Sequence, residues 1–384
     1  MTLLEHRPAG TAAGTTTLTA APARPTPIGF VIRALVAAAL AAAVLSPFLT
    51  IDFAQYASLA AIFAITGISL NIIVGYTGQL SLGHQGFLGM GSLVAANLVT
   101  SAHLPFALGL VGGAAAGAVA ALLLGLVALR ITGLYLSLIT LVFGLAVASS
   151  LFQLGSLTRN GSGLPANRPE FFASNGRYYL LCLAVLLAVY LLDVRLTTSK
   201  MGRALLALKE DERVAEAFGI NVTVYKLMAF ALSGALVGLA GGLYIFQVQS
   251  FSGASFEGTV GLNLALTFVV LVVVGGLGNR LGVVLAGAFF ALLDDVLSKL
   301  FLWDPFESVA RHIPLINAYY GNSKASVAGL IGAVLLLQTL IFNPGGVGQV
   351  VAPLQRWLKG APFTKHDPNA ESGPAAVEGS RVRA

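Results

Sequence analysis

The sequence predicts an all-α integral membrane protein, a polytopic bundle of about ten transmembrane helices. Hydrophobic residues make up 57% of the 384 residues and charged residues only 10%, whereas a soluble domain carries about 25% charged residues. The mean hydropathy of +0.85 agrees with a lipid environment. The apolar residues also form runs of roughly 20, the length that crosses the hydrocarbon core. Lipid offers backbone amides no partner, so such runs are expected to be helices. They lack the alternating pattern of a membrane barrel.

The candidate spans follow one another, with no segment between them long enough for a soluble domain. We expect the first span to be uncleaved rather than a signal peptide, because a long polar lead precedes it and Arg33 interrupts it. An alternative for residues 75–100 is entry into the bilayer without a full crossing, which leaves the number of spans open by one or two. The expected spans are 28–49, 54–74, 84–100, 105–128, 133–153, 177–195, 226–249, 259–278, 282–302 and 325–342.

Lysine and arginine predict the orientation, because they concentrate in cytoplasmic loops. With the N-terminus inside and each span crossing once, 16 of the 22 Lys and Arg residues lie inside. This topology places both termini and the charged loop 196–225 in the cytoplasm, and it places loops 154–176 and 303–324 outside. The outside residues are Arg159, Arg168, Arg177, Lys299, Arg311 and Lys324.

Three regions are expected along the chain. Residues 1–27, rich in Ala, Thr and Pro without an apolar period, predict a disordered cytoplasmic tail. Residues 28–350 form the transmembrane domain, and residues 351–384 a cytoplasmic C-terminal tail. An apolar span precedes Gly75-x-x-Gly78 and another precedes Gly275-Gly276-x-Gly278, which would fit two parallel halves. Apolar helices often end in glycines, so this repeat remains one of two interpretations.

Several classes of function are excluded or disfavoured. The net charge of +6 does not indicate nucleic-acid binding, because the basic residues lie in the tails and between apolar runs. Cys182 is the single cysteine, so neither an internal disulfide nor a cysteine-based metal site is expected. The chain lacks a nucleophile elbow, HExxH and GxxxxGK[ST]. We therefore expect no enzyme activity, no cofactor and no bound metal.

A glycine-rich segment, GYTGQLSLGHQGFLGMG, runs from Gly75 to Gly91 at membrane depth. Glycine costs about 1 kcal/mol relative to alanine within a helix. The segment also contains hydrogen-bonding side chains, which lipid disfavours. One interpretation is a broken helix facing a watery path, and the other is close helix packing through small residues. His84 is expected to form hydrogen bonds, because no second metal ligand is near it in sequence. The candidate residues are Gly75, Gly78, Gln79, Ser81, Gly83, His84 and Gly86.

The inside loop from Ser199 to Leu227 contains a candidate docking helix. Asp211 can cap a short helix that stops at Gly219. Such a helix suits docking against a soluble partner, and the alternative is a solvated loop at the headgroups. The candidate residues are Asp211, Glu212, Glu216, Ala217, Phe218 and Gly219, with Val214, Ala217 and Phe218 forming a small apolar face.

Two acids, Asp294 and Asp295, lie within the expected span 282–302. At about 1.5 Å per residue, Asp294 lies beyond the middle of the membrane. There it could bind a coupling cation or proton. The alternative, which we favour, is that Asp295 pairs with Lys299 one helical turn on.

Four segments in fixed order carry a resemblance to a known family. They are the glycine-rich segment, GRALLALKEDERVAEAFGINVTVYKLMAFALSGALVGLAGGLY, VVLVVVGGLGNRLGVVLAGAFFAL and the terminal LIFNPGGVGQ. Over roughly residues 54–350 the chain resembles the LivM-type permeases of branched-chain amino-acid ABC importers.

The resemblance implies an inner-membrane permease that pairs with a similar permease, two cytoplasmic ATPase subunits and an external substrate-binding protein. It also implies that Glu210–Gly219 holds the coupling helix to an ATPase, although Glu216-Ala217-Phe218-Gly219 departs from the longer EAA-x3-G pattern of other importers. Related permeases carry urea, amides or aromatic acids, so the substrate class is open. An ion-coupled secondary transporter of a small zwitterion is the alternative, with Asp294 and Asp295 as its only firm candidates for a charged relay.

Overall fold

The computed structural model describes residues 51–128, 131, 133–150, 154–158, 164–251, 262–301 and 346–348. The expected spans 28–49 and 325–342 and both tails lie outside these residues. The elements are α2 Ile51–Thr77, α3 His84–Thr100, α4 Phe106–Ala128, α5 Leu134–Ser149, α6 Gly155–Thr158, β1 Leu164–Pro165, the 3-10 helix η3 Glu170–Phe172, α7 Asn175–Thr198, α8 Lys200–Glu210, α9 Glu212–Ala217, α10 Val222–Val248, β2 Ser250–Phe251, α12 Leu262–Gly275 and α13 Arg280–Phe301.

The all-helical membrane bundle is confirmed for the described part of the chain. Four helices there are long and apolar enough to cross a membrane, namely Ala54–Thr77, Phe106–Val127, Asn175–Thr198 and Val222–Val248. Shorter apolar helices, including α5, α12 and α13, fall on other expected spans. The total of about ten spans stays a prediction.

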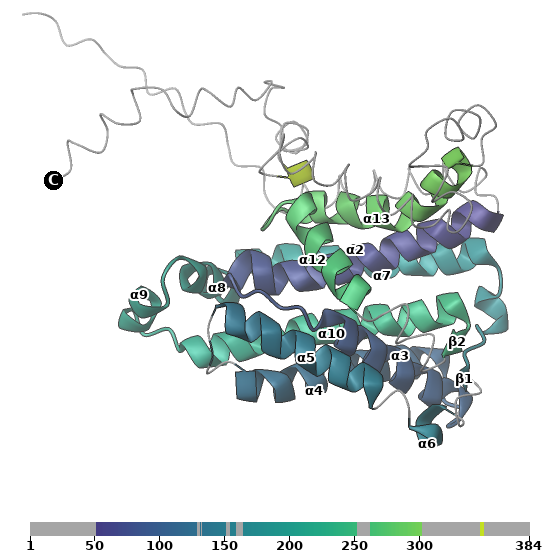
Figure 1. Cartoon of the computed structure of the whole chain (residues 1–384), viewed down its shortest axis with the longest axis horizontal. Coiled ribbons are helices and arrows are strands. Elements are labelled where there is room, and N and C mark those ends of the chain that lie inside the picture. The colour runs from purple at the N-terminus through teal and green to yellow at the C-terminus, as the bar shows by residue number, and fades with distance from the viewer. Residues whose placement is uncertain are drawn as a thin grey trace, which may run out of the picture.

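Helices α2 and α10 form the centre of the bundle. Helix α10 packs against α4, α3 and α2, while α2 also packs against α13 and α7. Figure 1 shows α12 and α13 on one side of this pair and α4 and α5 on the other. The four-residue glycine spacings, Gly113 with Gly117 and Gly234 with Gly238, place α4 directly against α10. Small residues at this spacing let two helix backbones approach closely.

The two ends of the bundle gather the segments that the predicted topology assigns to opposite sides. The α2–α3 connection, α8 and α9 lie at one end, and β1, β2 and α6 lie at the other (Figure 1). At the second end Arg168 donates to the Phe246 carbonyl at 2.7 Å and lies 4.0 Å above the Tyr178 ring. The sequence did not predict the two-residue antiparallel pairing of β1 with β2. Which end faces the cytoplasm stays a prediction.

Candidate functional site: the glycine-rich break and the α8–α9 lobe

A break between α2 and α3 carries the glycine-rich segment into the interior of the bundle. Helix α2 ends at Thr77, and Gly78 adopts a left-handed φ of +71° that turns the chain back. Helix α3 begins only at His84, whose ring meets Ser233 in the interior of α10. Ser233 lies about 17 Å along α10 at 1.5 Å per residue. Residues 78–83 therefore re-enter the bundle as irregular chain, and α3 starts deep within it.

His84 is part of a buried hydrogen-bond network that joins α2, α3 and α10. Its Nε2 lies 2.9 Å from Ser233 Oγ, and its Nδ1 lies 3.2 Å from Ser81 Oγ. Ser233 Oγ in turn donates to the Ser69 carbonyl at 2.8 Å. All four side chains are buried. Because each ring nitrogen has a partner, this network holds the start of α3 in place. Within the described residues, no group of three or more His, Cys, Asp or Glu side chains is placed to hold a metal.

The glycines of the break allow backbones to touch. A Cβ atom on Gly83 would lie 2.5 Å from the Thr140 carbonyl oxygen of α5, and one on Gly86 would lie 2.9 Å from the Gly144 Cα. Gly75 similarly faces the Gly278 amide of the α12–α13 turn, where a Cβ would lie 2.8 Å away. These glycines therefore lie at close backbone contacts, and whether they also line a path stays a prediction.

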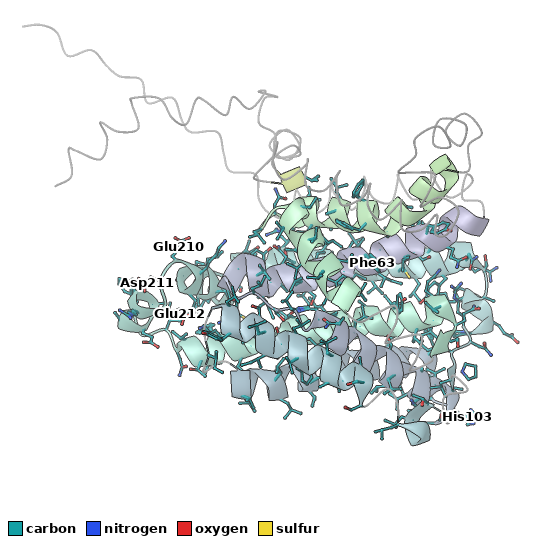
Figure 2. The ribbon with its side chains drawn as sticks, viewed as in Figure 1. Phe63, His103, Glu210, Asp211 and Glu212 are labelled. Atoms are coloured by element: carbon teal, nitrogen blue, oxygen red, sulfur yellow. The ribbon has the colours of Figure 1, made fainter. Side chains whose placement is uncertain are left out.

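The lobe formed by α8 and α9, residues 200–217, projects from one end of the bundle. Figure 2 shows Glu210, Asp211 and Glu212 on this lobe, at the opposite end of the molecule from His103. Asp211 Oδ1 accepts the amides of Arg213 at 2.8 Å and Val214 at 3.2 Å, so it caps α9 as the sequence predicts. The helix stops before Gly219, which has a φ of +79°.

Most apolar residues of α9 and its C-cap point outwards rather than into the bundle. Phe218 is 82% exposed and Val214 is 52% exposed. Ala217 is also exposed, while Ala215 is the residue that packs inwards. A groove of about 350 Å³ runs past Phe218 and Val214 between α8 and α9. The small apolar face expected from the sequence is therefore a free surface within the described structure.

The two glutamates of α9 are not equivalent. Glu212 Oε1 lies 2.6 Å from Lys226 Nζ of α10, so Glu212 ties the lobe to the central helix. Glu216 is exposed. Beside the lobe, Gln79 lines a cleft of about 370 Å³ together with Lys209 and Glu210. The Gln79 Oε1 atom is buried without a hydrogen-bond partner among the described residues. The cleft thus lies between the lobe and the glycine-rich break, which meet beside it where a Cβ on Gly78 would lie 3.4 Å from Lys209 Cγ.

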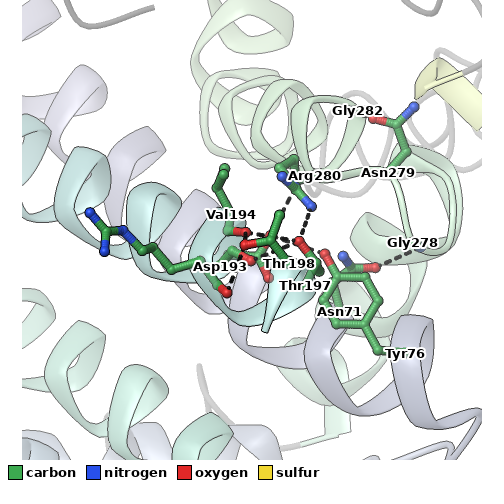
Figure 3. Close-up of polar contacts among 11 residues, drawn as sticks. Asn71, Tyr76, Asp193, Val194, Thr197, Thr198, Gly278, Asn279, Arg280 and Gly282 are labelled. Carbon is green, nitrogen blue, oxygen red and sulfur yellow. Dashed lines mark hydrogen bonds and ion pairs between the residues drawn. The ribbon is translucent and has the colours of Figure 1, made fainter. Parts of the chain in front are cut away.

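A buried ionic network lies at the same end and was not predicted from the sequence. Arg280 Nε of α13 lies 3.0 Å from Asp193 Oδ2 of α7, and its Nη2 donates to Thr197 Oγ1 at 2.7 Å. The Tyr76 hydroxyl of α2 donates to the same Asp193 oxygen at 3.0 Å. Figure 3 shows the three helices meeting here. An acidic residue near the end of an apolar helix was the available signal, but its partner lies far away in sequence.

The glycine motifs of the α12–α13 turn and of residues 346–348 lie beside this network. Asn71 Oδ1 of α2 accepts the Gly278 amide at 2.9 Å (Figure 3). Asn279 Nδ2 donates to the Gly348 carbonyl at 3.1 Å. A Cβ atom on Gly346 would lie 2.8 Å from the Gly276 amide nitrogen. Two segments that the resemblance singles out are therefore in contact. The side chains of Asp294, Asp295 and Lys299 lie outside the described residues, so their pairing stays a prediction.

The sequence matches a known protein family. Residues 53–340 match the model of the branched-chain amino acid transport system permease component. This chain belongs to that permease family. It is thus an ABC-type permease and not itself an enzyme.

Individual relatives of the chain are also permeases. The high-affinity branched-chain amino acid transport system permease protein LivM of Salmonella typhimurium is 30% identical over 315 residues, covering 71% of this chain and 73% of the relative. LivM of Escherichia coli K12 is 30% identical over 292 residues, covering 68% and 67%. The ribose import permease protein RbsC of Escherichia coli K12 is 26% identical over 286 residues, covering 70% and 84%. No solved structure gives a significant match to the permease.

In this permease the Arg280–Asp193 pair should matter for stability. Replacing Arg280 with alanine leaves the buried Asp193 carboxylate with only the Tyr76 hydroxyl as a partner. We therefore expect the free energy of unfolding to fall by about 3 kcal/mol. Thermal unfolding in detergent would measure it. Arg195→Ala is the matched control, because Arg195 is exposed on the last turn of the same α7. The double variant Arg280→Ala/Asp193→Asn should recover most of the lost stability. Equal melting temperatures for both single arginine variants would refute the prediction.

Proposed function

We infer that this chain is the transmembrane permease subunit of an ABC importer. It translocates branched-chain amino acids, or a related small polar solute such as urea or an amide, across the bacterial inner membrane. The observation that carries this proposal is the family match over residues 53–340, together with the two LivM relatives. The similarity to ribose import permeases shows that comparable sequences belong to importers of a different solute. Substrate choice must therefore be measured.

The proposed complex contains a paralogous permease subunit, two cytoplasmic ATP-binding subunits and an extracytoplasmic substrate-binding protein. In this arrangement both termini are cytoplasmic, and the α8–α9 lobe faces an ATPase. The exposed Phe218 and Val214 support this placement, because an apolar surface on a projecting helix suits a protein partner. Asp211 and Gly219 then keep α9 short and stiff, so that a push on it moves α7 and α10, which flank the lobe in the chain.

Reconstitution tests this function. The permease is placed in liposomes with its partner subunits and its binding protein, and uptake of radiolabelled leucine, isoleucine and valine is followed. We expect uptake that requires ATP and continues after ionophores collapse ion gradients. Uptake driven by an ion gradient without the ATPase subunits would instead support a secondary transporter. A competition panel with urea, small amides and ribose would define the substrate class.

A further inference from the structure

One buried polar side chain of the glycine-rich segment has no hydrogen-bond partner within the part of the chain that the structure describes. Gln85, in the first turn of α3, is 1% exposed. Among the described residues, neither its Nε2 nor its Oε1 has a hydrogen-bond partner. Leaving a buried donor or acceptor unpaired costs about 1–3 kcal/mol. A buried carboxamide without a fixed partner is therefore suited to binding a transient ligand.

The Gln85 carboxamide points into the seam between α3 and α5. A Cβ atom on Gly144 of α5 would lie 3.0 Å from Gln85 Cδ, so the carboxamide rests against the bare backbone of α5. Gly83, which directly precedes α3, and Gly86 of α3 line the same seam and meet Thr140 and Gly144. Thus small residues enclose an unpaired polar group along this contact.

Polar residues on the α10 side of α3 behave differently. His84 has partners at both ring nitrogens. Ser92 Oγ donates to the Gly241 carbonyl of α10 at 2.8 Å. Of these polar side chains of α3, the unpaired one is thus the one turned towards α5, where the Leu82 amide does find a partner in Thr140 Oγ1 at 2.9 Å. Helix α5 itself packs mainly against α3, with lesser contacts to α4 and α12, and its other face is exposed at Val142 (64%) and Leu138 (46%). Among the described helices that pack around the break, α5 is therefore the least tightly packed.

We propose that the α3–α5 seam forms a wall of the translocation path and that Gln85 binds the solute as α5 moves aside. This inference rests on the proposed function. The carboxamide offers a donor and an acceptor, and neither α3 nor α5 carries an Asp, Glu, Lys or Arg residue. The seam therefore suits a neutral or zwitterionic solute, whose carboxylate, ammonium or amide group completes the hydrogen bonds of Gln85.

Cysteine accessibility in the assembled transporter tests this inference. The native Cys182 is buried and is first replaced with serine. Gln85→Cys is then treated with a water-soluble methanethiosulfonate reagent, either at rest or during ATP-driven turnover with leucine-loaded binding protein. We expect the labelling rate to rise about tenfold during turnover. A small shift in population towards the state in which α5 has moved aside would produce this rise. Gly144→Cys, across the seam, is the second reporter. Ser92→Cys is the matched control, because Ser92 is equally buried on the same helix but faces α10; it should stay unreactive.

A substitution separates solute contact from a structural role. Gln85→Leu removes the carboxamide without leaving a void, so thermal stability should be unchanged or higher, because an unpaired polar group is lost. Leucine uptake should fall about tenfold, while ATP hydrolysis stimulated by loaded binding protein stays within about twofold of wild type. Normal uptake in this variant, or unreactive cysteines at both 85 and 144 in a complex with ATP-driven uptake, would overturn the inference. A wild-type complex without ATP-driven uptake would instead contradict the proposed function.

Discussion

Replacing Phe218 with alanine is expected to uncouple ATP hydrolysis from the permease. Phe218 is 82% exposed at the end of the capped helix α9, so it contributes little to the packing of the bundle. An aromatic anchor that enters a partner's pocket typically contributes about 2 kcal/mol or more. We therefore expect binding to the ATPase subunit to weaken by about 30-fold. A pull-down and an ATPase assay with loaded binding protein would measure the loss of affinity and of stimulation.

The control for this variant makes the same chemical change elsewhere. Phe171 is also exposed, at 67%, but it lies on η3 at the β1–β2 end of the bundle. Phe171→Ala should retain the ATPase subunit. Both variants should keep the wild-type melting temperature. Wild-type ATPase affinity and stimulation in Phe218→Ala would show that the coupling surface lies elsewhere, for example around Arg280.

The structure also separates the roles of the two glutamates on α9. The sequence offers both Glu212 and Glu216 as candidate residues for docking a partner. Because Glu212 is paired with Lys226 at 2.6 Å, it instead fixes the lobe to α10. Glu216 is exposed, so of the two glutamates it is the one that we expect to face a docking partner. A push on α9 would then reach the centre of the bundle through the Glu212–Lys226 pair.

Local features were the ones that the sequence could predict. The length of the apolar runs identified the helices, because lipid requires backbone amides to be satisfied within each span. The cap of α9 was equally readable, because Asp211 bonds amides only two and three residues away. The turn at Gly219 needs a left-handed φ, which glycine adopts readily.

Long-range features were not predictable from one sequence. The partner of Asp193 is Arg280, which belongs to another helix far along the chain. Similarly, the glycine spacings of α4 and α10 occur in many apolar helices, so spacing alone did not show which pair makes contact. The direction of the α9 face was also open, because a six-residue helix has too few turns to define a buried stripe. The unpaired state of Gln85 depends on α5, which no local pattern places beside it.

Leucine at Gly86 or Gly83 is expected to abolish uptake while the protein still inserts in the membrane. A Cβ at Gly86 would already lie 2.9 Å from the Gly144 Cα, and one at Gly83 would lie 2.5 Å from the Thr140 carbonyl oxygen. These are backbone atoms, which cannot rotate away as a side chain can. A leucine must therefore drive α3 and α5 apart, at a cost of about 1–3 kcal/mol from overpacking.

Insertion should survive these substitutions, because a leucine makes the segment more apolar and every spanning run remains intact. Gly176→Leu is the matched control, since its nearest non-neighbouring atom, Ser174 Oγ, would lie 3.9 Å from an added Cβ. Membrane fractionation would report insertion, and reconstituted uptake would report function. The control should transport normally, whereas the Gly83 and Gly86 variants should be present in the membrane and inactive. Full uptake in either variant would show that the close approach of α3 to α5 is dispensable, and the glycine-rich break would then be a packing solution without a role in transport.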